Sequence, residues 1–246
     1  MRRRDLLLGL AALLALWQLL AWLLRVDILP GPLAVIQALG REMAAGDLPR
    51  HFLASLWRVT ASTLVSIALA APAGLVLGQS QRLNRLFAPI IYMLYPIPKV
   101  VFVPVLLLFF GIGDLSKILV IFLILFFQIL VLVRDQAAAL RPELILSVRS
   151  LGAGRRALFR YVYLPASLPA VLTALRQSVG TAVAVLYVAE LFATRLGLGY
   201  YIYFQGSTLL NYPAMYAGVV LMSLLGLGLY FLVDWLEKRL CRWQMN

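Results

Sequence analysis

Residues 116–133, SKILVIFLILFFQILVLV, form an apolar run with a single charged residue, Lys117. A run of about 18 such residues is long enough to cross the hydrocarbon core of a bilayer as one helix. The chain contains six stretches of this kind, which we place at about 6–24, 56–78, 86–110, 116–133, 167–192 and 213–236. The sequence therefore predicts an all-α polytopic membrane protein with about six transmembrane helices, forming a single domain over residues 1–246.

The composition supports a membrane protein and leaves no room for a sizeable soluble domain. Of the 246 residues, 63% are hydrophobic and 13% are charged, whereas soluble chains are about half apolar and about a quarter charged. Cys241 is the only cysteine and His51 the only histidine. We therefore expect no intramolecular disulfide and no metal site.

The net charge of +12 is explained by the distribution of basic residues. Placing the N-terminus in the cytoplasm puts most Lys and Arg residues on the inner side, as is usual for membrane proteins. Six spans then predict that both termini are cytoplasmic, and nucleic acid is not needed to explain the charge. The start, MRRRDLLLGL, is similar to a twin-arginine export signal, but its long apolar run and the lack of a small-residue cleavage site favour a retained helix.

Two segments outside regular spans carry structural signals. YPIPKVVFVP, residues 95–104, contains Pro96, Pro98 and Pro104, which each remove a backbone donor, so we expect a kinked or partly unwound third span. The outer segment 25–51 contains LPGPLAVIQAL, which predicts a short helix along the membrane interface after Pro30 and Pro32.

The inner loop 141–165 is basic and has helical periodicity. Leu144, Val148 and Leu151 recur at i, i+4 and i+7, which predicts an amphipathic helix that ends at the glycines of LGAG. A second short helix, with Leu158, Phe159 and Val162 on one side, is predicted to end at Pro165. The residues alone allow either a knob for a cytoplasmic partner or a basic loop on anionic headgroups.

The stretch ELILSVRSLGAGRRALFRYVYLPASLP, residues 143–169, resembles the signature loop of inner-membrane permease subunits of ABC importers. Gly152, Val162, Leu164 and Pro165 match that pattern, whereas Leu146, Ser147 and Val148 stand where it has Glu-Ala-Ala. YPIPKVVFVPVLLLFFGIGDLSK and AELFATRLGLGYYI resemble the subgroup for nitrate, sulfonates, taurine and bicarbonate, which includes relatives for thiamine-pyrimidine precursors or riboflavin.

This resemblance implies a homodimer that works with two cytoplasmic ATPase subunits and an extracytoplasmic solute-binding protein in the bacterial inner membrane. ATP and Mg would bind the ATPase, and this chain, which has no G-x-x-x-x-G-K-[ST] phosphate loop, would be a transport subunit and not an enzyme. A coupling helix between the fourth and fifth spans would contact the ATPase. The residues expected there are Leu151, Gly152, Ala153, Gly154, Arg155, Arg156 and Phe159.

Polar groups at membrane depth are the candidates for a translocation path, because burying them in a membrane is costly. They are Lys99, Gln128, Arg176, Tyr187 and Glu190. We expect no carboxylate of the spans to neutralise Arg176, which would either cap carbonyls of a broken helix or contact solute. Lys99 would either snorkel to an interface or form a second cation near the path, and Glu190 would organise an outer gate.

The expected solute is a small oxyanion, with a vitamin precursor as the alternative within the same architecture. A self-sufficient carrier or channel is a second class that the sequence leaves open. A membrane enzyme is a third, disfavoured because no His, Asp and Glu cluster lies at an interface. Gly74 and Gly78 fit close helix packing and need no transport role.

Overall fold

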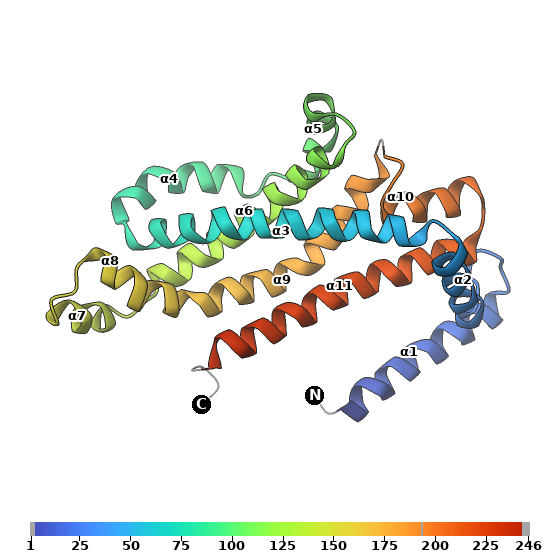
Figure 1. The fold of residues 1–246 in the computed structure, drawn as a ribbon, viewed down its shortest axis with the longest axis horizontal. Helices are drawn as coiled ribbons and strands as arrows, with labels where there is room; N and C mark the ends of the chain where they lie inside the picture. Colours follow the sequence, from blue (N-terminus) through green and yellow to red (C-terminus); the bar gives the residue numbers. More distant parts are fainter. Residues whose placement is uncertain (1–2, 193, 243–246) are drawn as a thin grey trace. The chain divides into compact units, whose positions relative to one another are not determined.

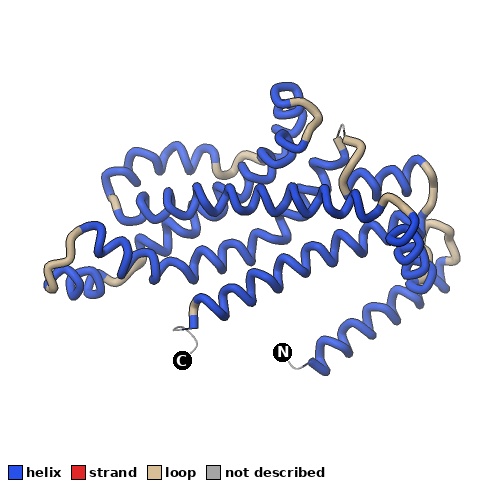
Figure 2. The backbone as a smooth tube through the Cα atoms, viewed as in Figure 1, coloured by secondary structure: helices blue, strands red, loops and turns tan. Residues whose placement is uncertain are grey.

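The structure is a computed structural model that describes residues 3–192 and 194–242, and over these residues it contains helices and loops but no strand (Figure 2). The described part has five helices long and apolar enough to span a membrane: α1 (Arg3–Leu24), α3 (Leu48–Gln79), α6 (Asp114–Ala138), α9 (Leu164–Leu191) and α11 (Tyr212–Leu240). A bent pair, α4 (Gln81–Leu94) with η1 (Lys99–Phe102) and α5 (Val103–Phe110), brings the number to six (Figure 1). The prediction of an all-α protein with about six spans is confirmed.

The chain divides into two compact units. The first contains residues 1–55 and 194–224, with α1, α2 (Pro32–Ala45), α10 (Leu198–Tyr203) and the π-helical segment η3 (Phe204–Thr208). Val35 and Ala38 of α2 are buried with Ala217. Pro32 begins α2, at a position where a helix needs no backbone donor. The predicted helix after Pro30 and Pro32 is therefore present.

The second unit contains residues 56–193 and 225–246, and its core lies where α6 packs on α9. Ile121, Leu125, Ile129 and Val133 are buried at four-residue spacing, which places them on one face of α6. On the α3 side of this helix, a Cβ atom at Gly78 would lie 2.5 Å from the Arg134 carbonyl oxygen. The close packing predicted for Gly78 is thus confirmed, and it rests on the absence of a side chain.

The third span is broken where the prolines predicted a kink. The Ser80 Oγ caps α4 by accepting a hydrogen bond from Leu83 N at 3.4 Å. After Leu94 the chain passes Pro96 and Pro98, and the two halves are bent by 77°. One span over 86–110 is therefore replaced by two helices, because neither proline donates the hydrogen bond that would continue α4.

The predicted end of the inner helix at Pro165 is wrong. α8 (Arg155–Leu158), the π-helical segment η2 (Phe159–Tyr163) and α9 follow one another without a break. In η2 the amide of Leu164 donates to the carbonyl of Phe159, five residues back. This wider turn accommodates Pro165, which lacks a donor and whose ring would clash with the carbonyl four residues back in an α-helix. The loop therefore runs directly into the fifth span.

Candidate functional site

An exposed bend of the second unit separates α7 (Pro142–Ser150) from α8. The amide of Gly152 donates to the Arg149 carbonyl at 2.9 Å, and Gly152 has φ +81°. This is the left-handed region that side chains with a Cβ disfavour. The adjacent Leu151 is 86% exposed, so the bend presents an apolar side chain to its surroundings.

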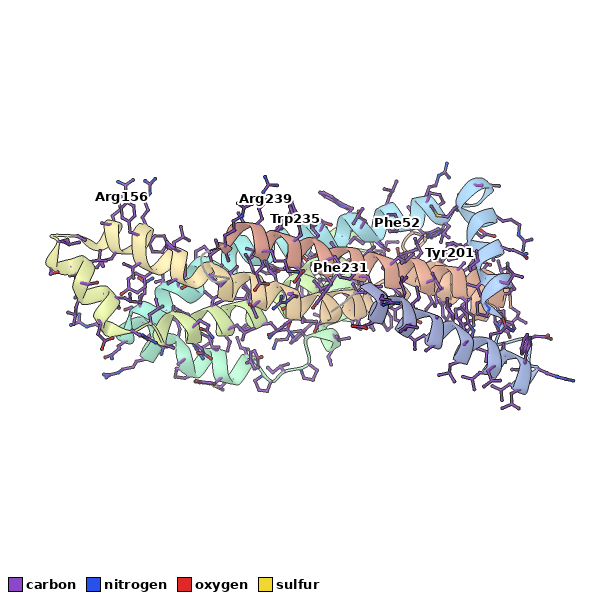
Figure 3. All side chains as sticks on the ribbon, turned by 90° about the horizontal axis from the view of Figure 1, so that it is seen from below. Phe52, Arg156, Tyr201, Phe231, Trp235 and Arg239 are labelled. Atoms are coloured by element: carbon purple, nitrogen blue, oxygen red, sulfur yellow. The ribbon has the colours of Figure 1, made fainter. Side chains whose placement is uncertain are left out.

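The residues predicted to couple to an ATPase lie on this bend and the following turn. Gly152, Gly154, Arg156 and Phe159 are exposed and Ala153 is half-buried, and the side chain of Arg156 projects away from the ribbon (Figure 3). Arg155 begins α8, and its side chain lies outside the described part. Their role in coupling stays a prediction.

The same segment is anchored to the second unit by two other side chains. Leu158 and Val162 are buried, at 3% and 7% exposure, whereas Phe159, predicted on the same side, is 37% exposed. The segment therefore has an inward face that packs and an outward face that is free. The helical run from Arg156 to Leu191 contains 36 residues, about 54 Å at 1.5 Å per residue. It connects the bend to Glu190 without a break.

Glu190 is part of a buried ion-pair cluster built from three helices. Arg58 of α3 donates from Nη1 to Glu190 Oε1 at 2.7 Å and from Nε to Asp114 Oδ1 at 2.8 Å. The side chains of Arg58 and Glu190 are 4% and 0% exposed, and that of Asp114 is 45% exposed. Because charges buried without partners are very costly, this pairing fixes α3, α6 and α9 relative to one another.

Lys117 extends the cluster to the GIG turn before α6. Its Nζ donates to the carbonyls of Ile112 at 2.7 Å and Gly113 at 3.0 Å, and the residue is 1% exposed. Gly111 has φ +75°, so this turn also uses backbone that favours glycine. The Lys117 ammonium thus secures the turn that joins the broken third span to α6.

In the first unit, the LGLG segment is held in a comparable way by α3. Gly197 N donates to His51 Nδ1 at 3.1 Å, and Leu198 N donates to Ser55 Oγ at 2.7 Å. Gly197 has φ +126°. These side chains satisfy amides at the start of α10, which have no acceptor within that helix. His51 thus has a structural role at the start of α10.

Tyr201 of α10 lies beside His51, with ring centroids 5.3 Å apart. Its burial, followed by the nearby Glu42 carboxylate, raises the pKa of Tyr201. The phenol therefore stays protonated.

The expectation that Arg176 lacks a carboxylate partner is wrong. Its Nη1 lies 3.3 Å from Asp234 Oδ1 and 2.9 Å from Glu237 Oε2, both on α11. Thr173 also donates to Glu237, at 3.2 Å. The two acidic residues lie at or just beyond the predicted end of the sixth span, and α11 continues to Leu240, so its last turns bring them to α9.

The carbonyl-capping role expected for Arg176 belongs instead to Lys99. Its Nζ donates to the Tyr95 carbonyl at the end of α4, and lies 4.8 Å from the centroid of the Phe127 ring. The Lys99 ammonium thus satisfies a carbonyl that lies beyond the end of α4, where the helix is broken.

The remaining path candidates are half-buried in α6 and α9. Gln128 has a buried Oε1 that lacks a hydrogen-bond partner within the described residues, and Tyr187 is partly exposed. All five path candidates stay predictions, because these contacts show how the side chains are held and not what passes them.

The long apolar helices define a polytopic all-α membrane protein. Residues 66–242 match the family described as binding-protein-dependent transport system inner membrane component, and the chain belongs to this family. It is therefore an inner-membrane ABC transporter permease.

Three relatives resemble it over nearly their whole length. The taurine transport system permease protein TauC of Escherichia coli (strain K12) is 30% identical, with 95% of this chain and 87% of that protein covered. The putative aliphatic sulfonates transport permease protein SsuC of Bacillus subtilis (strain 168) is 28% identical, covering 95% and 85%. The riboflavin transport system permease protein RibX of Chloroflexus aurantiacus is 32% identical, covering 89% and 81%.

The fold is also similar to a solved structure, the inward-facing MetNI methionine ABC transporter. The TM-score is 0.68 at 21% sequence identity, with 81% of this chain and 98% of that chain covered. At this identity the likeness shows the fold alone.

Sequence reasoning missed the partners of Glu190. Arg58, Asp114 and Lys117 each stand in or beside an apolar run, and charged residues in such runs are usually paired. The signal available in the sequence was therefore the presence of two cations and two carboxylates near the same ends of neighbouring spans.

Proposed function

We propose that this chain carries a small sulfonate-type oxyanion, such as taurine, across the inner membrane as part of an ATP-driven importer. The similarity to the taurine and aliphatic sulfonate permeases over 95% of the chain supports this class of solute. Nitrate and bicarbonate are the other small oxyanions within the proposal.

The proposed assembly contains two copies of this chain, two cytoplasmic ATPase subunits with ATP and Mg, and an extracytoplasmic solute-binding protein. The family description supports the binding protein. Both termini would lie in the cytoplasm, as the excess of basic residues on that side favours. The bend at 151–154 would then face the ATPase.

One observation carries the proposed coupling: a single helical run connects the exposed bend to the Arg58 cluster. Movement of Gly152 and Arg156 with the ATPase would be transmitted along the 36-residue run to Glu190. Because Glu190 holds Arg58, which holds Asp114, the movement would reach α3 and the start of α6 together. Opening toward the outside would follow from this joint displacement.

Uptake in proteoliposomes tests the function. Proteoliposomes that contain the permease, its ATPase and its binding protein should accumulate labelled taurine. They should do so only when ATP is present on the side of the membrane that carries the ATPase. Accumulation that persists without the ATPase subunit would contradict the importer and favour a self-sufficient carrier or channel. Taurine recovered chemically altered would instead indicate an enzyme.

Two substitutions test the coupling role of the bend. Gly152→Pro, which cannot adopt a positive φ, and Arg156→Glu should insert normally but separate ATP hydrolysis from uptake. Each should lower the taurine transported per ATP by about tenfold or more. Arg85→Glu, an exposed charge reversal on α4, is the matched control. Unchanged coupling in both bend variants would refute the assignment.

The second candidate solute is a vitamin or vitamin precursor, favoured by the similarity to the riboflavin permease. The two solutes differ in charge and ring structure. Calorimetry on the cognate binding protein with taurine and with riboflavin decides between them, and tight binding of riboflavin alone would replace the sulfonate proposal.

A further inference from the structure

We propose that the second unit contains a binding site for a phosphate-type anion, at the end that carries α7 and α8 (Figure 1). A cavity of about 490 Å³ lies there, within the range of about 300–1,000 Å³ typical of small-molecule sites. Its lining comes from the end of α3, the start of α4, α7 and the α8–η2 turn. The lining residues are Val76, Gln79, Ser80, Arg82, Arg149, Leu158 and Tyr163.

The polar side chains of the lining can all donate hydrogen bonds, and two of them, Arg82 and Arg149, are positively charged. Arg82 and Arg149 approach from different helices, and within the described part of the chain neither forms an ion pair. The lining residues include no carboxylate. Guanidinium groups match phosphate oxygens in pairs of parallel hydrogen bonds, so two of them at one cavity favour a tetrahedral oxyanion.

A separate observation points to a missing acceptor. The Gln79 Nε2 is buried and has no hydrogen-bond partner among the described residues. Buried donors are nearly always satisfied, and an anion oxygen in the cavity would accept from this amide. The cavity also borders the first turn of the 14-residue helix α4, whose amide groups and dipole favour a negative charge.

Phosphate of this kind has two sources, a lipid headgroup and a free anion. Basic pockets between membrane helices bind anionic headgroups on the cytoplasmic side, and the same groups would hold inorganic phosphate. In either case the anion would bridge Arg82 of α4 and Arg149 of α7, just before the bend at Gly152. The binding itself does not rest on the proposed function; an effect on coupling does.

Binding is tested on the purified full-length permease without other subunits. Calorimetry with inorganic phosphate and native mass spectrometry from nanodiscs with and without phosphatidylglycerol distinguish the two sources. Arg82→Gln and Arg149→Gln should each weaken binding by about tenfold, because each removes charge-assisted hydrogen bonds. Arg85→Gln, an exposed residue of α4 outside the lining, should bind like the original protein.

The result decides the proposal in either direction. Phosphate binding lost in both variants supports a free-anion site, and phosphatidylglycerol retention lost in both supports a headgroup site. Arg82→Lys and Arg149→Lys, which keep the charge, should lose less and show that the loss is not misfolding. Equal binding of both probes by the original protein and the Gln variants would overturn the proposal. Hydrogen exchange over 141–163 should slow on binding in the original protein only.

Discussion

At the residue scale, Arg58 of α3 pairs with carboxylates of α6 and α9, and this pairing allows the Arg58 and Glu190 charges to be buried. Its guanidinium contacts Glu190 and Asp114, each at 2.7 Å at the closest. Water cannot replace the cation of a buried carboxylate. Removing one partner of such a pair therefore also destabilises the other. The sequence predicted Glu190 as an organising residue but gave no distance to Arg58, which lies 132 positions away.

Arg58→Ala should lower the free energy of unfolding by about 3–5 kcal/mol, because it removes the buried cation that pairs with the Glu190 carboxylate. Replacing both partners, Arg58→Met with Glu190→Leu, should recover most of that loss. Thermal unfolding in detergent, read as a double-mutant cycle, measures the coupling. Arg50→Ala removes an exposed pair with Asp47 and should change the free energy by less than about 1 kcal/mol. Additive effects of the two buried replacements would refute the coupling.

At the element scale, helix positions depend on small residues and on how prolines are accommodated. The spacing of Gly74 and Gly78 predicted close packing, and α6 is the partner that the sequence could not name. Pro165 was predicted to end a helix, because proline usually does so. Instead, the five-residue π turn of η2 absorbs it. Whether Pro165 ends the helix or is accommodated by a wider turn depends on the tertiary packing of Leu158 and Val162. A sequence pattern does not contain that information.

Gly78→Ala should destabilise the protein by about 1–3 kcal/mol, since the added methyl would force α3 away from the α6 backbone. Gly180→Ala in α9 is the matched control, because a Cβ there meets no atom within 4 Å and alanine favours helix more than glycine. Chemical unfolding of both variants in the same detergent compares them. Equal stability of the two would show that α3 and α6 do not pack as closely as described.

At the scale of the whole molecule, the charge available for an anionic solute differs from what the sequence predicted. Arg176 faces Asp234 and Glu237, and Lys99 satisfies the Tyr95 carbonyl. Both cations therefore have partners within the protein. The electrostatic attraction expected for a sulfonate at these two residues is reduced accordingly.

Arg176→Gln should lower the free energy of unfolding by about 1–3 kcal/mol, because Glu237 loses its cation and Asp234 retains only Lys238. Taurine uptake should fall with the loss of stability. Adding Glu237→Gln should restore part of the stability and part of the uptake. Thermal unfolding and the concentration dependence of taurine uptake measure both effects. A tenfold rise in KM at unchanged stability would show instead that Arg176 contacts the solute, and a matching rise for Lys99→Gln would extend this to the second cation.

The sequence by itself determined the membrane class, the number of spans, the break at the prolines and the bend at Gly152, because each depends on local apolar length or backbone chemistry. Only the tertiary structure decided the partners of Arg58, Arg176 and Lys117 and the continuous run from the bend into α9. Ion pairs between helices depend on which faces meet after packing, and residues distant in sequence share no local signal that specifies this.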